Sequence, residues 1–334
     1  MSTTTLYLSS IAFGSAKQRP QQMAEQYARL GSVIWGSYIN CKEQLVTNRI
    51  TEKSLVSSMK ELLDGGCTIP NVDLVVVDHP MWGLALKNYS GPLVFDIIDN
   101  YTEFHELTNW KEQLKERTIE LSEKASLITT TCKELAPNQA VVIPNGVDTS
   151  VFKPIRGIHN KPVYFGSLAY WINYDLVLDL NEMDLIGPVC IPDKVIKEKI
   201  IKRGKGILSH VEIVKSSGRW ACGTIPFIQN DLTNYVNPVK FYEYMALGLP
   251  IVSTPCDEIV RLSSTIPTEL SPRIVDVKDF TNTVREICRE EYSVELARAR
   301  HQWARQHSWR SRFDSISTQV KRIINETKRN NNNQ

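Results

Sequence analysis

The chain has 334 residues, of which 42% are hydrophobic and 23% charged, an ordinary balance for a soluble globular protein. Because a single hydrophobic core stops growing at roughly 250–300 residues, this length predicts two domains. Lys and Arg number 39 against 37 Asp and Glu, and the net charge of +2 argues against a protein that coats nucleic acid, since such binding neutralises many phosphates.

The composition also bears on location. The N-terminal segment 1–14 has no basic stretch before its short apolar part, so it is a poor signal peptide. No run approaches the roughly 18 apolar residues of a membrane-spanning helix. Seven widely spaced cysteines without a Cys-x-x-Cys pair predict buried, reduced thiols in a cytoplasmic protein. The histidines show no metal-binding spacing, so we predict neither a metal nor a cofactor.

Short apolar runs alternate with helical patterns in the first half of the chain. The predicted strands cover 5–10, 32–35, 73–78, 93–98, 126–130 and 140–144, and the predicted helices cover 21–31, 52–64 and 104–125. Gly31 is the expected C-cap of the first helix. The run 73–78 is continuously apolar, as in strands that are buried on both faces. This alternation predicts a doubly wound, mostly parallel α/β sheet.

The pattern restarts in the second half. The predicted strands cover 161–166, 183–187, 210–215, 222–227 and 250–254, and the predicted helices cover 175–180, 193–203 and 240–248, with two or three more at the end. The chain therefore predicts two Rossmann-like domains, over 1–152 and 153–312, with their ligand-binding strand ends facing each other across a cleft. A helix over 313–328 is expected to pack back on the first domain, and the polar tail 329–334 to be disordered.

The most informative segment lies around residues 237–243. Asn237 is the predicted N-cap of a helix whose first residue is Pro238. Lys240 in the first turn opposes the helix dipole, unless an anion such as a diphosphate sits at the helix N-terminus. Glu243, one turn later, is placed to accept hydrogen bonds from a ribose diol. The alternative is an ordinary surface pair between Lys240 and Glu243, and the spacing alone does not decide between them.

Several segments resemble one enzyme family. The stretch NPVKFYEYMALGLPIVST (237–254) resembles the donor-binding signature of GT-B glycosyltransferases, particularly family 4 and its relatives with a P-x-K-x-Y-E-Y-x-A-x-G-x-P motif. IPNGVDTSVF (143–152) resembles that family's link between domains, and YFGSLAYWINYDL (164–176) resembles the start of its donor domain. The segment around Arg19-Pro20 resembles the family's opening strand, loop and helix, and HSWRSRF (307–313) its closing segment. The resemblance covers almost the whole chain in the family's order.

The resemblance implies a metal-independent, retaining glycosyltransferase with a GT-B fold. It would move a sugar from a nucleotide diphosphate sugar to a saccharide or lipid-linked acceptor, in bacterial surface polysaccharide or glycoconjugate assembly. It implies that Glu243 binds the donor ribose and that Lys240, with the amides around Val239, neutralises the departing diphosphate. The loop Gly166-Ser167 would pass close to those phosphates.

The sequence also departs from the family pattern. Tyr235 stands where many members carry a Glu that touches the transferred sugar, and with Asn237 it completes the predicted donor site. Asp96 and Asp99 stand where the family usually has a His. Asp99 is therefore a candidate catalytic residue, although an Asp at a strand end also suits a turn. The alternatives are another GT-B chemistry (an inverting transferase or a sugar-nucleotide epimerase) and a catalytically silent nucleotide-sugar-binding subunit.

Three further features have two interpretations each. His79 ends a predicted strand, either as a contact to the acceptor or sugar or as a loop histidine before a proline. Arg19 lies on the first loop, either against a phosphate or in solvent. The stretch 194–206 carries five Lys and one Arg against one Glu. We favour a solvated helix there, and the alternative is peripheral association with the inner face of an anionic membrane.

Overall fold

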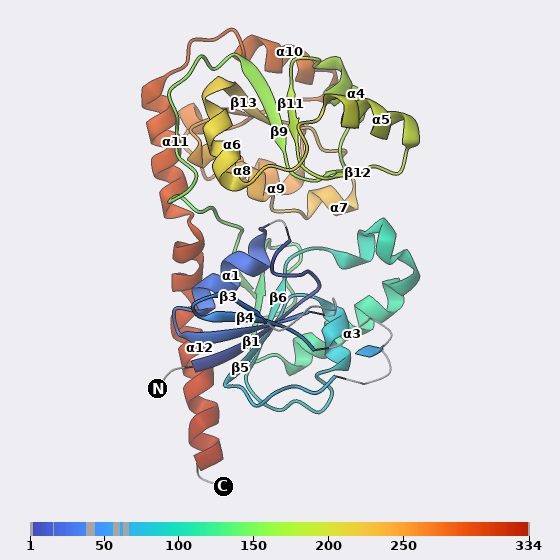
Figure 1. Cartoon of the computed structure of the whole chain (residues 1–334), viewed down its shortest axis with the longest axis vertical. Helices are drawn as coiled ribbons and strands as arrows, with labels where there is room; N and C mark the ends of the chain where they lie inside the picture. The colour runs from blue at the N-terminus through green and yellow to red at the C-terminus, as the bar shows by residue number, and fades with distance from the viewer. Residues whose placement is uncertain (1–2, 16, 38–43, 56–60, 63–66, 333–334) are drawn as a thin grey trace. The chain divides into compact units, whose positions relative to one another are not determined.

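The computed structural model describes residues 3–15, 17–37, 44–55, 61–62 and 67–332, and Figure 1 traces their course. The chain forms two units. Unit 1 combines Met1–Pro144 with Trp309–Gln334, and unit 2 is Asn145–Ser308. The division therefore falls at 144/145 rather than at 152/153. Residues 145–152 belong to unit 2 because their apolar side chains, Phe152 among them, pack into its core.

Unit 1 is built on one sheet of strand order β3-β4-β2-β1-β5-β6-β7-β8, parallel except for β3 against β4. The strands are β1 (Thr3–Ser9), β2 (Gly31–Ser37), β3 (Gln44–Thr47), β4 (Ile50–Ser54), β5 (Leu74–Val77), β6 (Leu93–Ile97), β7 (Leu127–Thr130) and β8 (Val141–Val142). The apolar runs of β5 and β6 are buried along their whole length. The strand order reverses between β1 and β5, and such a switch point is where open α/β sheets bind ligands.

The helices of unit 1 include one from the far end of the sequence. They are α1 (Arg19–Tyr27), α3 (Lys111–Lys124), α12 (Trp309–Asn332) and the 3-10 helices η1 (Pro80–Leu84), η2 (Tyr101–Glu103) and η3 (His105–Trp110). Figure 1 shows α12 side by side with α1. The rings of Tyr27 and Phe313 meet edge to face with centroids 4.9 Å apart, and Lys328 pairs with Asp73 at 2.8 Å. The tail expected to be disordered is thus helical as far as Asn332.

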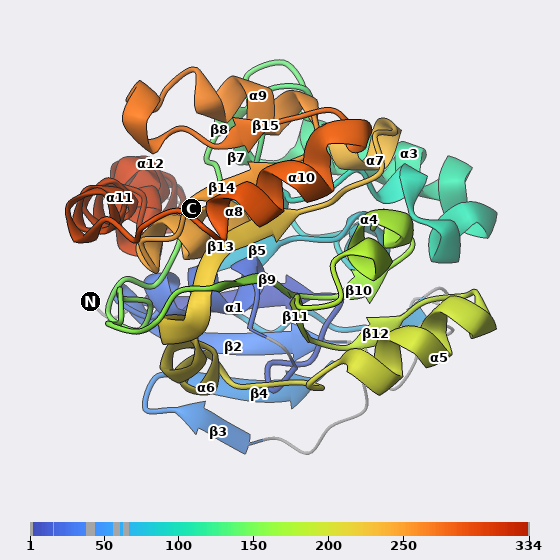
Figure 2. The same ribbon diagram turned by 90° about the horizontal axis from the view of Figure 1, so that it is seen from above.

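Unit 2 holds a parallel sheet of order β11-β9-β13-β14-β15 and a small pair, β10-β12. The strands are β9 (Lys161–Phe165), β10 (Leu168–Ala169), β11 (Asp184–Ile186), β12 (Val189–Cys190), β13 (Trp220–Ile225), β14 (Ile251–Ser253) and β15 (Arg273–Ile274). The order reverses between β9 and β13. Figure 2 shows α10 lying across β13 and β14, so this helix covers one face of the sheet.

The helices of unit 2 surround this sheet. They are α4 (Tyr174–Asp179), α5 (Lys194–Arg203), α6 (His210–Ser216), α7 (Asp231–Asn234), α8 (Val239–Ala246), α9 (Asp257–Ser263), α10 (Val277–Ile287), α11 (Val294–Gln306) and the 3-10 helices η4 (Ser217–Arg219) and η5 (Thr268–Leu270). Helix α8 is buried from Phe241 to Ala246, which explains its almost continuous apolar and aromatic sequence. No helix in the described ranges is both long and apolar enough to span a membrane.

Some predicted elements were wrong. Gly31 does not cap α1, which ends at Tyr27. It begins β2, where a Cβ would lie 1.9 Å from the carbonyl oxygen of Thr3, so the close approach of β1 requires glycine. Residues 52–54 of the predicted helix 52–64 belong to β4. Residues 56–60 and 63–64 of that helix lie outside the described part of the chain.

Two more corrections concern local signals. The segment 210–215, predicted as a strand, is helix α6. Ser209 and Glu212 form a capping box there, and this start signal outweighs the alternation of apolar residues. The cysteines are also less uniformly buried than predicted. Cys190 is exposed and Cys67 and Cys288 are half-buried, while Cys41 lies outside the described residues.

Candidate functional site

The predicted donor site of unit 2 is built around Gly166. This residue follows β9 at its carboxyl end, beside the point where the strand order reverses. Its φ of +139° suits only glycine, and a Cβ there would lie 2.6 Å from Cε of Lys240. Glycine therefore lets the Lys240 side chain lie directly against the strand end. The structure brings together two residues that are 74 positions apart in the sequence.

Helix α8 begins beside this glycine, with Pro238 rather than Asn237 at the N-cap. Pro238 has no capping side chain, and the N–H groups of Val239 and Lys240 have no hydrogen-bond partner among the described residues, whereas that of Phe241 donates to the Pro238 carbonyl oxygen at 3.0 Å. Two backbone N–H groups of the first turn can therefore receive an anion. The prediction that Asn237 caps the helix was wrong because its side chain is bound elsewhere. Its Oδ1 accepts a hydrogen bond from the Asn145 amide at 2.8 Å, and its Nδ2 donates to Glu258.

Lys240 and Glu243 form an ion pair one turn into α8. Nζ of Lys240 lies 3.0 Å from Oε2 of Glu243 and 5.4 Å from the centroid of the Phe165 ring. The Glu243 side chain is 5% exposed and that of Lys240 25%. An ordinary surface ion pair contributes too little free energy to offset the desolvation of a carboxylate as buried as that of Glu243. We therefore interpret this pair, beside backbone N–H groups that can bind an anion, as more than a surface pair.

The remaining predicted donor residues lie on the adjoining connections. Ser167 follows Gly166, and its carbonyl oxygen accepts a hydrogen bond from the Tyr164 hydroxyl at 3.0 Å. Val239 is the first residue of α8. Tyr235 is the half-buried C-cap of α7, on the short connection that leads to α8.

Unit 1 carries a second group of predicted residues, at the carboxyl ends of β5 and β6. His79 and Asp99 follow these two neighbouring parallel strands, so both lie at the same edge of the sheet. Burial raises the pKa of Asp99 to about 7, although the charge of Arg19 acts in the opposite direction. Burial lowers the pKa of His79 to about 4, and its Nδ1 accepts the Met81 N–H at 3.3 Å. At neutral pH Asp99 can therefore exchange a proton, while His79 is a neutral ring.

Arg19 fits neither of its two sequence interpretations. It is only 3% exposed, and its guanidinium forms a bidentate ion pair with Asp96. Nε donates to Oδ2 at 2.9 Å and Nη2 donates to Oδ1 at 2.8 Å. Nη1 donates to the carbonyl oxygen of Ile143 at 2.8 Å, and the Thr129 hydroxyl donates to Asp96 at 2.7 Å. Arg19 is the first residue of α1 rather than part of the first loop, and with Asp96 it holds the start of α1 against β6 and β7.

The sequence interpretation missed Asp78, the residue that ends the apolar run 73–78. It is fully buried, next to Ser9 and Ser10 at the switch point of the sheet. Burial raises its pKa to about 8, and neither of its carboxylate oxygens has a hydrogen-bond partner among the described residues. A charged residue at the end of a strand buried on both faces was the signal that could have found it.

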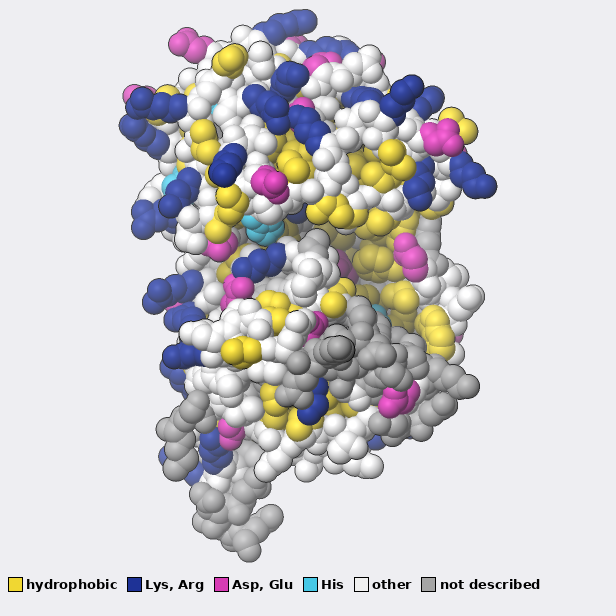
Figure 3. Space-filling view, in the orientation of Figure 1, with side chains coloured by type: hydrophobic (Ala, Val, Ile, Leu, Met, Phe, Trp, Pro, Cys, Tyr) yellow, Lys and Arg dark blue, Asp and Glu magenta, His cyan; other side chains and the backbone are white. Residues whose placement is uncertain are grey.

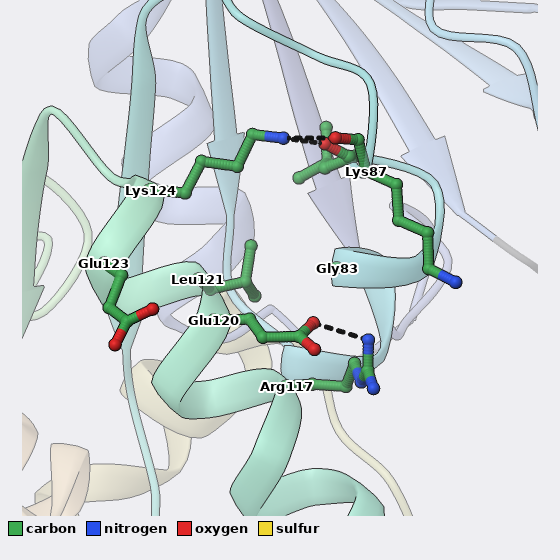
Figure 4. Close-up of a pocket in the computed structure, with 8 residues that line it drawn as sticks. Gly83, Lys87, Arg117, Glu120, Leu121, Glu123 and Lys124 are labelled. Carbon is green, nitrogen blue, oxygen red and sulfur yellow. Dashed lines mark hydrogen bonds and ion pairs between the residues drawn. The ribbon is translucent and has the colours of Figure 1, made fainter.

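One surface hollow lies away from these groups. A cavity of about 420 Å³ lies between η1 and α3, lined by Gly83, Leu86, Lys87, Arg117, Glu120, Leu121, Glu123 and Lys124. Figure 4 shows Lys124 pointing to backbone carbonyls and Arg117 paired with Glu120, so these cations are already occupied within the chain. None of the predicted site residues lines this hollow. Within the described ranges, no three His, Cys, Asp or Glu side chains cluster in a way that could hold a metal ion.

Comparison with known proteins gives a likeness in structure alone. The sequence matches no protein-family model, and a search of curated proteins gave no match. HepE of Anabaena, solved in complex with UDP and glucose, superposes with a TM-score of 0.71 at 14% identity, covering 96% of this chain and 99% of that chain. The sucrose-phosphate synthase of Thermosynechococcus elongatus gives 0.70 at 11% identity, covering 97% of this chain and all of that one.

The third similar structure is the catalytic domain of starch synthase IV from Arabidopsis thaliana, bound to ADP and acarbose. It gives a TM-score of 0.63 at 10% identity over 98% of this chain and 99% of that one. These likenesses extend over both units and agree with the two parallel sheets described above. The chain therefore has the GT-B fold that its sequence predicted.

Proposed function

We propose that the protein is a glycosyltransferase that uses a nucleoside diphosphate sugar as donor. The observation that carries this proposal is the arrangement of Gly166, Lys240 and Glu243 at the open N-terminus of α8. It offers backbone amides and a cation to a diphosphate, and a buried carboxylate to a ribose. The HepE structure in complex with UDP-glucose supports the same class of donor.

The ion pair between Lys240 and Glu243 suggests how the donor is received. The diphosphate would draw Nζ of Lys240 away from Glu243, and the carboxylate would then accept both ribose hydroxyls. Lys240 would exchange the carboxylate for the diphosphate, and Glu243 would exchange the ammonium group for the ribose hydroxyls. Neither side chain would then be buried without a partner. As the sugar bond breaks, Lys240 and the α8 amides would stabilise the negative charge that grows on the leaving diphosphate.

Donor binding tests this assignment by isothermal titration calorimetry with UDP, UDP-glucose and ADP. Glu243→Gln should weaken nucleotide binding by roughly 10- to 100-fold, the loss expected for a hydrogen bond to a charged group. Lys240→Met should lower kcat more than affinity. Lys202→Met on the exposed face of α5 is the matched control and should change neither. Unchanged binding and turnover in both site variants would refute the assignment.

Asp99 is the proposed catalytic residue of unit 1. A carboxyl group with a pKa of about 7 suits proton exchange with an acceptor hydroxyl at neutral pH, and His79 at the same edge of the sheet would orient the acceptor or the sugar. Asp99→Asn should lower transfer by about 100-fold or more while donor affinity stays within about twofold. Transfer or slow UDP-glucose hydrolysis by the purified protein would exclude a catalytically silent binding subunit.

We further propose that transfer retains the anomeric configuration and needs no metal. NMR of the product distinguishes retention from inversion, and activity after exhaustive treatment with EDTA tests the metal independence. An inverted product, or activity restored only by a divalent cation, contradicts these two points and leaves the donor site untouched.

The acceptor is proposed to be a saccharide or a lipid-linked saccharide, in cytoplasmic assembly of a bacterial surface polysaccharide or glycoconjugate. Figure 3 shows Lys and Arg side chains where α5 lies, and Val195 and Ile201 of this helix are 63% and 56% exposed. These exposed residues are compatible with the helix resting on an anionic membrane. Sedimentation with phosphatidylglycerol vesicles, against phosphatidylcholine vesicles as control, distinguishes this from a solvated helix.

A further inference from the structure

A second cavity lies within unit 2, at the sheet edge opposite Gly166. Its volume is about 450 Å³, within the range of small-molecule sites. Residues just before or at the start of β9, β13 and β14 line it, whereas Gly166 follows the end of β9. The connection from α10 to α11 and the first turns of α11 form the other wall. Nothing in the proposed donor site uses these residues.

Arg300 of α11 is the main charged group of this cavity. It is 8% exposed and forms no ion pair within the described part of the chain. Its guanidinium donates one hydrogen bond, from Nη1 to the carbonyl oxygen of Gly248 at 3.3 Å, and its Nε has no partner. Burial lowers its pKa to about 10, so the group keeps its charge at neutral pH. The charge of Glu290 acts favourably on this guanidinium and that of Arg273 unfavourably, and no carboxylate is paired with it directly, so an anion in the cavity would stabilise it.

His159 provides a second unsatisfied atom. The residue is 5% exposed, and its φ of +50° is in the left-handed region. Its ring lies flat on Tyr292, with centroids 3.6 Å apart and planes 5° apart. Nδ1 lies 2.9 Å from the Trp220 carbonyl oxygen, which can only accept, so Nδ1 carries the proton. Nε2 is buried and has no hydrogen-bond partner among the described residues, and a ligand hydroxyl would satisfy it.

The outer part of the cavity has a different character. Arg273 is paired with Glu290, with Nη2 2.7 Å and 2.9 Å from its two carboxylate oxygens. Glu269 and Glu291 also line the cavity and are exposed. Carboxylates at the opening would repel a bare polyanion, but they accept hydrogen bonds from hydroxyl groups. The cavity thus combines a buried cation with several hydroxyl acceptors.

We propose that this cavity is a second ligand site, which binds a small anion that carries several hydroxyl groups, such as a sugar phosphate. The anionic group pairs with Arg300, and hydroxyls donate to Nε2 of His159 and to the carboxylates at the opening. This proposal does not depend on the donor site, because no residue is shared between the two.

Calorimetry with three probes tests the proposal. Glucose 6-phosphate carries both features, inorganic phosphate only the charge, and sorbitol only the hydroxyls. We expect glucose 6-phosphate to bind with a Kd of about 1 mM or below, and the other two at least about tenfold more weakly. Arg300→Gln should weaken glucose 6-phosphate binding about 10- to 100-fold, as for the loss of a charged hydrogen bond. His159→Asn keeps a residue that tolerates the left-handed backbone and should weaken binding by a smaller factor.

Two controls locate the binding. Arg298 lies on the exposed face of the same helix, so Arg298→Gln should bind glucose 6-phosphate like the wild type. Lys240→Met should also bind glucose 6-phosphate normally, and saturating UDP should not displace it. Absence of binding to the wild type, or loss of binding in Lys240→Met but not in Arg300→Gln, overturns the proposal.

A measurement on the unaltered protein covers the case in which Arg300→Gln folds poorly. Glucose 6-phosphate should slow amide hydrogen exchange in peptides that cover 268–273 and 290–300, while UDP alone should not. Equal exchange in these peptides with and without glucose 6-phosphate would also overturn the proposal.

Discussion

Two carboxyl groups in unit 1, of buried Asp78 and half-buried Asp99, make its stability depend on pH. Asp78 and Asp99 both have pKa values raised by burial, to about 8 and about 7, from an ordinary value near 4. Between pH 4 and these values the folded state holds protons that the unfolded chain has released. Each group therefore lowers the free energy of unfolding progressively as the pH rises, and the full loss is reached only above the raised pKa.

We predict that Asp78→Asn reverses part of this dependence. The amide cannot ionise, so the variant does not lose stability as the pH rises. The difference in unfolding free energy between the variant and wild type should therefore increase by about 3 to 4 kcal/mol from pH 5 to pH 8, in favour of the variant. Urea unfolding at the two pH values measures the difference, with exposed Glu123→Gln as the control. A variant whose free-energy difference from wild type is equal at both pH values would contradict the raised pKa.

The pair between Arg19 and Asp96 gives a second residue-scale prediction. Arg19→Met leaves Asp96 charged and buried, and should lower the unfolding free energy by about 3 to 5 kcal/mol. Adding Asp96→Asn removes that unpaired charge, so the double variant should be more stable than Arg19→Met alone. Urea unfolding of all four members of the cycle tests this. Additive losses would show that the pair is not coupled.

Sequence patterns could predict only part of these sites. Lys240 and Glu243 lie one turn apart on a helix, and the motif around them predicts both their place and their chemistry. Arg19 and Asp96 are 77 positions apart, and each alone suits a surface loop or a strand end. Their pairing depends on which strands become neighbours in the sheet, which local patterns do not specify.

Among the elements, α8 is held by a chain of hydrogen bonds that starts at Asn145, the first residue of unit 2. Asn145 donates to the backbone and side chain of Asn237, Asn237 donates to Glu258 of α9, and Arg261 donates to Glu258 at 2.6 Å. The Glu258 carboxylate has no exposed surface. It fixes the connection that leads into α8 and so sets where the open N-terminus of this helix lies.

Glu258→Gln should therefore destabilise the protein, although the two side chains have nearly the same volume. The variant loses the charge that binds Arg261 and Asn237, at a cost of about 2 to 3 kcal/mol. Asp257→Asn changes a neighbouring exposed residue in the same first turn and should cost far less. Thermal unfolding of the two variants compares them directly. Equal melting temperatures would mean that the network does not support α8.

Helices and strands were predictable where the residues that determine them are close together in the sequence. Strands that are buried along their whole length, such as β5, β6 and β13, follow from their largely apolar composition. The apolar alternation of 210–215 predicts a strand, but the capping box between Ser209 and Glu212 starts helix α6 there. The strand β4 was mistaken for a helix because residues 50–54 gain their apolar partners only by pairing with β2.

At the scale of the whole molecule, unit 1 is completed by the end of the chain. Ile316 and Val320 of α12 are fully buried, and its Phe313 packs on Tyr27. Removal of residues 309–334 should therefore raise amide hydrogen exchange in peptides from 3–37 and 67–144. Peptides from 160–300 should keep wild-type protection, because they belong to the other unit. Uniform loss of protection over both units would contradict this division.

The two-unit α/β architecture follows from length and from the repeated strand and helix pattern, and this much was predictable. The division point was eight residues off, because the segment 145–152 looks like a link by composition but packs into unit 2.

The late arrival of α12 has a consequence for synthesis. During translation, residues 3–144 leave the ribosome before residues 309–332, and until then they lack the helix that covers their apolar surface beside α1. Unit 2 is contiguous and can fold as soon as residue 308 has emerged. Unit 1 is thus completed only after unit 2, and until then the apolar surface that α12 covers stays exposed.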